Sequence, residues 1–543
     1  MMVSALEGIL PNWYVRQTNY WFYGIDSVMQ MAQLDMAEDV IPTSAKSPAA
    51  LNRYIYYPDH LVRMPGSLPG ANLLTQIATN FMTVAQEPIF KGAVGGLFSE
   101  PSVTARSKYV QDESVGKFVT RRFGRHVADN LVSALFHGIY AGDLYKLSAR
   151  TILPLFWHLE EISETGIVGA IAEQMWNGES LLPYDDIQFT LQSDQTLNIS
   201  PTPMKALADK LEGSSVYTFK KGLAQLAEKT EAGLRKCDNV EIKHMTAALA
   251  FDSRTNQFSI TDADHPKKTI EENTHKYDYV VATIPSQQLS KALYNHCATN
   301  STSLASPCSG MLTHLYNSTS TVNVMVVNLF YRNPNLIPVV GFGYLIPRSI
   351  AIDQNPERAL GVIFGSATSR ASSNVSADPD QSNPSQDSAP GTKLTVMMGG
   401  HWWSSWSSSD LPNEETAVEM AKAVLERHLG ITDAPVVAKA RMQWNAIPQY
   451  EVGHHERMAG IHHDLRREFD GRLKVAGSAY QGVGVNDCVK AARKASFDIR
   501  EGLDERTGLE SFGQEMRWAV YKRRERAVYM LDKGKRGAGL EDG

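Results

Sequence analysis

Two periods of hydrophobic spacing divide the chain into predicted strands and helices. Near its far end, residues 473–476 form a short apolar run, residues 477–484 contain three glycines, and apolar residues then recur at helical spacing over 485–499. An apolar run of this length is typical of a buried strand, and apolar residues spaced three or four apart are typical of one face of a helix. We therefore predict a strand, a glycine turn and a helix that is entered through Asn486 and Asp487.

The start of this predicted helix is a candidate binding feature. A helix start leaves backbone N–H groups without partners, and the aligned peptide dipoles place roughly half a positive charge there. Such an end suits an anionic or strongly polarised group of a ligand. Because many helices begin after a glycine turn, the spacing alone leaves a purely structural role open.

The first part of the chain is predicted to be a hairpin followed by helices. Residues 49–57 and 61–62 have the composition of two strands joined by a turn. Residues 70–212 have a mostly helical pattern, in which acidic residues open one helix at Asp112 and a second helix runs over 127–140.

The middle of the chain changes to an α/β pattern over residues 213–285. Apolar spacing predicts a helix over 223–234 and a strand over 240–242. The polar residues 276–279 are then followed by an apolar stretch, which we predict to be a strand that ends at Pro285. We expect a domain boundary at this proline.

Residues 286–445 have the pattern of a sheet domain. The run 321–331 is strand-like, and because both of its faces are apolar we expect it to be buried in a sheet. One face of this run carries Val322, Val324, Val326 and Asn328. Further strand-like runs occur at 341–347, 360–364 and 394–400. Residues 365–393 hold hardly a large apolar side chain, so we expect a disordered insertion there.

Composition narrows the classes of function. The chain has 543 residues, enough for two or three domains, with 43% hydrophobic and 21% charged residues and a net charge of −6, which argues against a nucleic-acid partner. The four cysteines show neither zinc-ligand nor disulfide spacing. No apolar run reaches the ~18 residues that a membrane-spanning helix needs. Residues 503–543 are expected to be a tail, in which 515–531 can form a short basic helix.

The amino-acid sequences of several stretches resemble motifs of the protoporphyrinogen oxidase family of flavoenzymes. The strongest match is Ala-Gly-Ser-Ala-Tyr-Gln-Gly-Val-Gly-Val-Asn-Asp-Cys at 476–488, and the resemblance covers roughly residues 33–500. The matching stretches, in chain order, are Arg53–Tyr54, 112–118, 138–143, 341–347, 397–400, 447–450 and 476–488.

This resemblance implies an α/β fold of the two-dinucleotide-binding-domain type with an α+β substrate domain built on a mixed sheet. The implied organisation assigns 34–80 and 286–445 to the substrate-binding domain, 81–212 to a helical membrane-docking region, and 213–285 with 446–502 to an FAD-binding domain. The implied reaction is the FAD-dependent oxidation of protoporphyrinogen IX to protoporphyrin IX, the penultimate step of haem synthesis. Dioxygen would be reduced to hydrogen peroxide. The family also implies one-sided (monotopic) association with the mitochondrial inner membrane, and it leaves a homodimer open.

The resemblance also assigns site residues, although no catalytic triad and no metal ligand set stand out. A flavin performs redox chemistry itself, so the protein needs to supply only binding, orientation and electrostatics. The residues implied to bind substrate are Gly138, through its carbonyl, and Phe342, Leu345 and Met397. The residues implied to contact the flavin are Ala248, Ser478, Val483, Gly484 and Val485.

Two departures from the family pattern matter. Many members carry an arginine just after the first hairpin that can pair with a substrate propionate, but residues 64–73 hold none and Arg63 lies too early. The family also begins with a strand and a Gly-x-Gly-x-x-Gly loop for the FAD pyrophosphate. Residues 1–35 do not supply that loop, so 1–33 stays unassigned and we expect a truncated or mis-started reading frame.

Two rival hypotheses follow from these departures. The chain can be another FAD-dependent member of the amine oxidase and desaturase superfamily, which should lack the wording at 138–143 and 341–347. It can also be a flavin-free or inactive remnant that binds porphyrin without turnover, a hypothesis that the absent loop favours.

Overall fold

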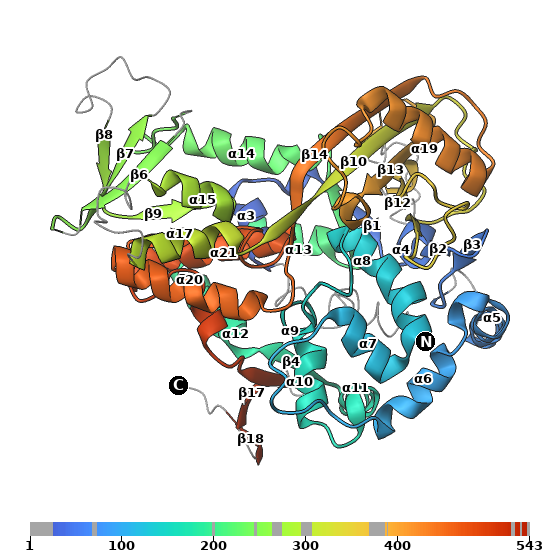
Figure 1. The fold of residues 1–543 in the computed structure, drawn as a ribbon, viewed down its shortest axis with the longest axis horizontal. Helices are drawn as coiled ribbons and strands as arrows, with labels where there is room; N and C mark the ends of the chain where they lie inside the picture. Colours follow the sequence, from blue (N-terminus) through green and yellow to red (C-terminus); the bar gives the residue numbers. More distant parts are fainter. Residues whose placement is uncertain are drawn as a thin grey trace.

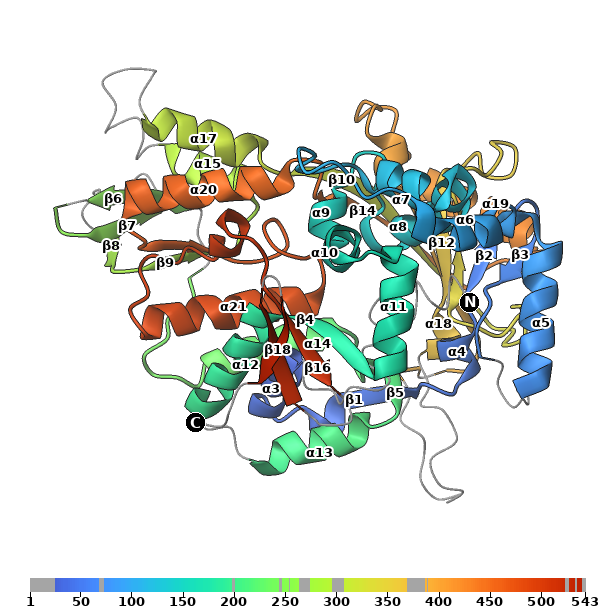
Figure 2. The ribbon, with the colours of Figure 1, turned by 90° about the horizontal axis from the view of Figure 1, so that it is seen from below.

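The computed structural model describes residues 25–67, 73–197, 201–243, 247–252, 254–262, 274–294, 307–368, 386–387, 389–522, 527–532 and 535–539. Two bodies of sheet and helix lie side by side, and the long strands β10 (Ser320–Tyr331) and β14 (Val437–Gln449) run from one to the other (Figure 1). A third group, made mostly of the helices of residues 73–177, lies beside both bodies (Figure 2).

The larger sheet has seven strands in the order β14-β10-β13-β12-β11-β2-β3. All neighbouring pairs are antiparallel except β11 with β2, so the sheet is mixed, as predicted. Helix α19 (Glu414–Leu429) packs on one face, where its apolar side is buried against β10, β12 and β13. The remaining strands are β2 (Tyr54–Tyr56), β3 (Leu61–Arg63), β11 (Gly343–Leu345), β12 (Ala359–Phe364) and β13 (Thr392–Gly399).

The other body is built on the parallel pair β9 (Val280–Ala282) and β15 (Leu473–Val475). Helices pack over this pair and bury its apolar residues. They are α15 (Ser286–Ala292), α17 (Pro307–Asn317) and α20 (His454–Phe469). A three-stranded antiparallel sheet of β6 (Ala247–Asp252), β7 (Gln257–Asp262) and β8 (Thr274–Tyr277) lies beside them. Helix α21 (Val485–Arg500) follows β15, which confirms the predicted strand, glycine turn and helix.

A second small sheet joins segments that the sequence assigned to different domains. Strand β1 (Val40–Ser44) pairs with β5 (Ser214–Phe219), so residues from the predicted substrate domain and the predicted FAD-binding domain share hydrogen bonds. Helix α3 (Ile25–Gln33) and α13 (Pro201–Leu211) pack around this pair. The other helices here are α4 (Pro48–Leu51), α12 (Tyr184–Leu197) and α14 (Ala224–Leu234).

The described part of residues 70–212, which the sequence predicted to be mostly helical, consists of helices and one strand. Its helices are α5 (Leu73–Gln86), α6 (Ala93–Ser99), α7 (Val115–Phe123), α8 (Ser133–Tyr140), α9 (Ala149–Ile152), α10 (Pro154–Ile162) and α11 (Gly166–Asn177), with a π-helical segment at Val127–Val132. Strand β4 (Glu179–Pro183) follows α11, and α12 and α13 complete the region. Ser114 caps α7 by accepting the backbone N–H of Lys117, so this helix begins just after the acidic pair that the pattern identified.

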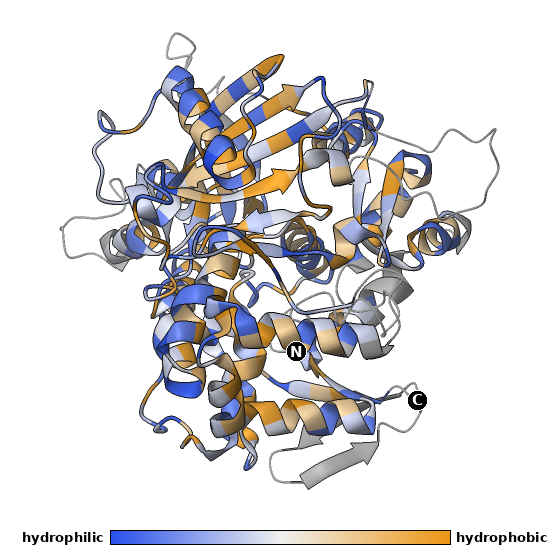
Figure 3. Ribbon diagram, turned by 90° about the vertical axis from the view of Figure 1, so that its right-hand side faces the viewer, coloured by the Kyte–Doolittle hydropathy of each residue, from blue (hydrophilic) through white to orange (hydrophobic). Residues whose placement is uncertain are grey.

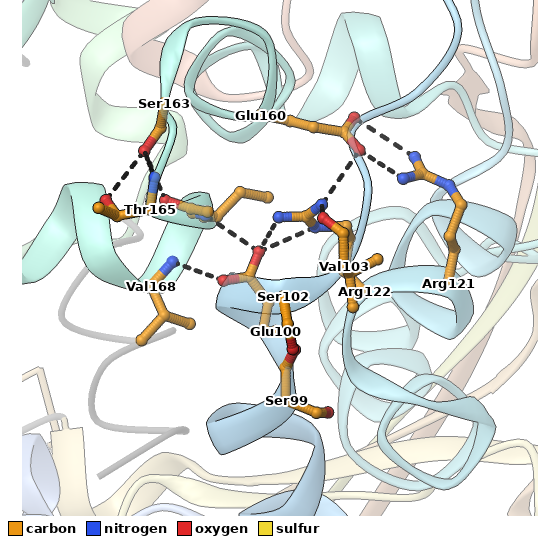
Figure 4. Close-up of polar contacts among 12 residues, drawn as sticks. Ser99, Glu100, Ser102, Val103, Arg121, Arg122, Glu160, Ser163, Thr165 and Val168 are labelled. Atoms are coloured by element: carbon orange, nitrogen blue, oxygen red, sulfur yellow. Dashed lines mark hydrogen bonds and ion pairs between the residues drawn. The ribbon is translucent and has the colours of Figure 1, made fainter.

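A buried charge network holds this helical region together (Figure 4). Glu100 is fully buried and accepts the backbone N–H groups of Ile167 (3.0 Å) and Val168 (2.9 Å), which are free at the start of α11. The guanidinium of Arg122, also buried, donates to Glu100 (2.8 Å). One carboxylate therefore links α6, α7 and α11.

Several predicted boundaries were wrong. Residues 240–242 form no strand and are largely exposed, because no described strand lies beside them to complete a ladder. Residues 503–513 are not a tail: Thr507 and Leu509 are fully buried, and the backbone N–H of Val475 in β15 donates to the carbonyl of Thr507.

The short basic helix that the sequence allowed at 515–531 is not formed in the described residues. Residues 518–522 form strand β16, which pairs with β4, and β17 (Ala527–Asp532) and β18 (Lys535–Gly539) continue that sheet. Hydrogen bonding to the edge of β4 decides the conformation here, which local charge could not predict. The expected insertion 365–393 is too wide, since α18 occupies Gly365–Thr368 and β13 begins at Thr392; residues 369–385 and 388 lie outside the described residues.

Candidate functional site

The turn between β15 and α21 has a backbone that requires glycine. Gly477 and Gly482 have φ values of +109° and +67°, which side chains rarely adopt. A Cβ atom on Gly482 would also lie 2.4 Å from the carboxyl group of Asp487. That carboxyl group accepts the backbone N–H of Gly484 (3.2 Å) and so closes the turn over the start of α21. Burial raises the pKa of Asp487, while the nearby Lys490 ammonium lowers it.

A cavity of about 690 Å³ lies against this turn and along α21. Its walls include Ser478, Val483 and Val485, three of the five residues predicted to contact a flavin. Gly484 lies between the last two of these in the chain. The fifth residue, Ala248, lies on β6 opposite Thr261, and its side chain is outside the described part of the structure.

Helix α3 closes one side of the cavity, which the sequence had not indicated. Gln30 and Gln33 line the wall, and Ser27 donates a 2.6 Å hydrogen bond to the side-chain oxygen of Asn486. Asp26 forms an ion pair with Arg493 of α21 (3.1 Å). These partners are more than 450 residues apart in the chain, so no local pattern could have assigned residues 25–33.

The turn is also joined to the seven-stranded sheet. Thr319, at the start of β10, donates to the carbonyl of Ala479 (3.1 Å), and Tyr450, at the end of β14, donates to the carbonyl of Ser478. Strands β10 and β14 therefore lead directly from the cavity to the sheet. Burial raises the pKa of Tyr450, so its hydroxyl remains a proton donor.

The sheet face opposite α19 brings two predicted substrate residues into one row. In register, Val326 of β10 lies opposite Met397 of β13, Met397 opposite Gly361 of β12, and Gly361 opposite Leu345 of β11. Strands are spaced about 4.8 Å apart, so the Cα atoms of Leu345 and Met397 lie roughly 10 Å apart with only a glycine between them. Both side chains are half-buried, which suits the wall of a ligand site better than a closed core.

Gly138 lies next to this row, in the last turn of α8. A Cβ atom on Gly138 would lie 2.8 Å from the Leu345 side chain, so the two residues are in direct contact. Within the described residues, no hydrogen bond to the Gly138 carbonyl is formed, and Ala141 ends the helix in the left-handed conformation. A free carbonyl at a helix C-terminus is a good acceptor for a ligand N–H group.

Phe342, the fourth predicted substrate residue, lies just before β11. Its ring is half-exposed and the Arg53 guanidinium covers it at 4.5 Å from the centroid. The structure therefore brings Gly138, Leu345 and Met397 together and places Phe342 at the end of the same strand.

Two histidines support this site, and the sequence did not single them out. His137 Nδ1 lies 2.7 Å from the carbonyl of Ile346, which can only accept, so Nδ1 carries the proton. His137 Nε2 must then accept from His401 Nε2, 2.8 Å away. Burial lowers the pKa of both rings, so the pair is neutral at physiological pH.

Comparison with known proteins shows the family of this chain. The family model described as "Flavin containing amine oxidoreductase" matches residues 30–500. Protoporphyrinogen oxidase of Schizosaccharomyces pombe is 29% identical over 466 residues, which are 86% of this chain and 82% of that protein. The human protoporphyrinogen oxidase is 26% identical over 480 residues, covering 88% and 84%.

Solved structures share the fold. A crystal structure of a protein from Exiguobacterium sp. 255-15 has a TM-score of 0.58 at 17% identity and covers 89% of this chain and 86% of that chain. Reduced UDP-galactopyranose mutase gives a TM-score of 0.52 at 13% identity, covering 91% and 87%. These matches confirm the predicted α/β flavoprotein fold. The chain belongs to the family of flavin-containing amine oxidoreductases, which are FAD-dependent oxidoreductases.

Proposed function

We propose that this protein oxidises protoporphyrinogen IX to protoporphyrin IX with FAD as its cofactor, and that dioxygen reoxidises the flavin to give hydrogen peroxide. The observation that carries the proposal is the row of Met397, Gly361 and Leu345 beside the free carbonyl of Gly138. Relatives named protoporphyrinogen oxidase that match over most of the chain support it.

The described residues fit the flavin end of FAD. The cavity beside the glycine turn has the volume of a small-molecule site, and its wall is mostly apolar. Ser478, Val483 and Val485 would hold the ring there, and the start of α21 faces the same turn. When bound, FAD supplies the capacity to accept hydrogen from a carbon atom of the substrate.

The protein's own part is to bind and orient a flat, apolar substrate. Met397 and Leu345 would pack against the macrocycle, and Phe342, just before β11, would flank it. The end of the Leu345 side chain lies over Gly361, 3.0 Å from where a Cβ atom would stand, so these two residues form one continuous surface. The Gly138 carbonyl would accept a pyrrole N–H and so fix the rotation of the ring. Such a wall excludes water, which strengthens that hydrogen bond.

The direct test is turnover of protoporphyrinogen IX by the full chain supplied with FAD, followed by the fluorescence of protoporphyrin IX. We expect Met397→Glu to abolish turnover, since a charge against an apolar ring costs several kcal/mol, while the protein still folds. A matched control is Met516→Glu at an exposed position outside the site, which should keep activity. Oxidation of simple primary amines with no turnover of the porphyrinogen would favour the rival amine oxidase hypothesis.

We extend the proposal to one-sided association with a membrane, the mitochondrial inner membrane by analogy with the family. No described helix is both long and apolar enough to cross a bilayer. Large apolar side chains are exposed on α5, α6 and α11, and Figure 3 shows the side of the molecule that carries α5 and α6. They are Phe81, Met82, Val94, Phe98, Met175 and Trp176.

A further inference from the structure

We propose that Arg441 on strand β14, assisted by Lys439, anchors the carboxylate groups of the substrate. This inference deepens the proposed function and rests on it. The sequence left the carboxylate anchor unassigned, because no arginine follows the first hairpin.

The register of the sheet places Arg441 in the substrate row. Arg441 lies opposite Val326, which lies opposite Met397, so the row runs Arg441, Val326, Met397, Gly361 and Leu345 across five strands. Lys439 lies one step along the same face, opposite Asn328.

The two faces of β14 are distinct, which fixes the side on which Arg441 lies. Ala440 and Met442 pack into the core under α19. Residues alternate between faces along a strand, so Lys439 and Arg441 belong to the opposite face, the one that carries Met397 and Leu345. Both basic residues are exposed.

Other arginines near the row are already engaged. Arg63 donates to the Asn52 side chain (2.9 Å) and to the carbonyl of Ser67 (2.8 Å). Arg53 covers Phe342, and Arg348 pairs with Asp143 (2.7 Å). In the described part of the chain, by contrast, Arg441 forms no ion pair and no side-chain hydrogen bond. Its guanidinium is free to bind a carboxylate through two parallel hydrogen bonds.

The distances suit a ligand that is apolar at one edge and acidic at the other. Strand spacing puts the Cα atom of Arg441 roughly 10 Å from that of Met397, and an extended arginine side chain covers much of this gap. The row thus changes from apolar at Leu345 and Met397 to cationic at the sheet edge. A tetrapyrrole that lies over Met397 with its propionates toward β14 matches this order of properties.

A simpler role for these charges is protection of an exposed edge strand against pairing with another chain. The two roles are separated by the chemistry of the ligand. Edge protection has no preference between a free acid and its methyl ester, whereas a carboxylate anchor requires the acid.

The experiment measures equilibrium binding of protoporphyrin IX and of its dimethyl ester to the purified full chain by fluorescence. It compares the wild-type protein with R441Q, K439Q and a control, R332Q, which removes an exposed arginine at the turn after β10. We expect R441Q to bind the acid about tenfold more weakly, because one charge-assisted hydrogen-bonded contact is lost, and to bind the ester as well as wild type does. K439Q should show a smaller loss and R332Q none.

Each outcome has a definite reading. Equal binding of the acid by R441Q and wild type would overturn the anchor while leaving the proposed substrate in place. An equal loss for acid and ester would assign Arg441 a structural role and overturn the anchor too. If wild type binds neither compound, the proposed function fails and this inference fails with it. The same variants should raise the KM for porphyrinogen turnover with little change in kcat.

Discussion

At the scale of single residues, the contact between Gly138 and Leu345 leads to a selective prediction. In Gly138→Ala the new methyl group would lie 2.8 Å from the end of the Leu345 side chain, which is too close, so that side chain would have to move. The variant would therefore change the shape of the proposed substrate site. Because alanine favours a helix by up to about 1 kcal/mol over glycine, stability should hold or rise. We expect a several-fold higher KM at an unchanged or higher thermal midpoint. Gly310→Ala on α17, where no atom lies within 4 Å of the new methyl, is the control and should leave KM unchanged.

A second residue-scale prediction concerns His428 and acid stability. His428 Nε2 donates to the carbonyl of Gln354 (2.9 Å), Nδ1 accepts from the Tyr344 hydroxyl (3.0 Å), and Tyr56 stacks on the ring. Burial lowers its pKa from 6.5 to about 4. The unfolded chain therefore binds more protons between these values, and the free energy of unfolding should fall as pH drops through 6.5 toward 4.

This effect can be measured by urea unfolding at pH 7 and pH 5. His428 should contribute roughly 2 kcal/mol to the difference in the free energy of unfolding between the two pH values. The maximum contribution that the full lowering of its pKa permits is about 3 kcal/mol. His428→Gln should be less stable at pH 7 yet show a smaller difference between the two pH values. An undiminished difference would mean that other buried histidines, such as His454, account for the acid sensitivity.

The residues of the site differ in how far the sequence could identify them. Leu345, Met397 and Gly138 were assigned by the wording of their motifs, and the structure places them in contact or in one row. The His137–His401 pair and Arg441 were not found, because their significance lies in strand register and in contacts between residues far apart in the chain.

At the scale of elements, α5, α6 and α11 carry the membrane prediction. Phe81 and Phe98 are 73% and 79% exposed, which is costly in water but favourable in a lipid interface. We expect the chain to float with liposomes and the double variant Phe81→Glu, Phe98→Glu to remain in the soluble fraction. Tyr316→Glu on α17, an equally drastic change to an exposed aromatic residue, should float like wild type. Wild-type protein that stays soluble would contradict the idea.

The Glu100 network provides a second element-scale prediction. Removing this carboxylate in Glu100→Ala would leave Arg122 buried with part of its charge uncompensated and would uncap α11, at a cost of about 3–5 kcal/mol. The double variant Glu100→Ala, Arg122→Met should recover part of that loss, since it removes the unpaired charge as well. Denaturant unfolding measures both. If the double variant loses as much free energy of unfolding as the two single variants together, the two side chains are not coupled.

Elements were predicted well where one local signal dominates. Strand β10 and helix α21 match their predicted spans closely. A mostly apolar run in β10 and a helical apolar period in α21 each extend over eleven or more positions. The C-terminal strand β16 was missed, because its conformation is set by hydrogen bonding to β4, more than 300 residues earlier. The same reason applies to β1 and β5, which cross the predicted domain boundary.

At the scale of the whole molecule, the fold class followed from dispersed family motifs rather than from periodicity. The seven-stranded sheet takes its strands from two segments far apart in the chain, residues 54–63 and 320–449. Residues 25–33, which the sequence left unassigned, form α3, which packs on α21 and lines the cavity beside the glycine turn. Contacts of this kind depend on three-dimensional assembly and leave no periodic trace in the sequence.

The last prediction concerns how tightly this polypeptide holds FAD. The cavity beside the glycine turn is the proposed place of the flavin ring, but the sequence contains no Gly-x-Gly-x-x-Gly loop, the usual support of the pyrophosphate. Strand β15 pairs only with β9 in the described part, and Val281 of β9 is 37% exposed, although parallel strands are usually buried on both faces. Several charge-assisted hydrogen bonds of roughly 1.5–3 kcal/mol each would be missing, so FAD should bind little better than FMN. We expect the purified chain to carry well under one flavin per polypeptide, measured by visible flavin absorbance against protein absorbance. A yellow protein with one FAD per chain would contradict this prediction.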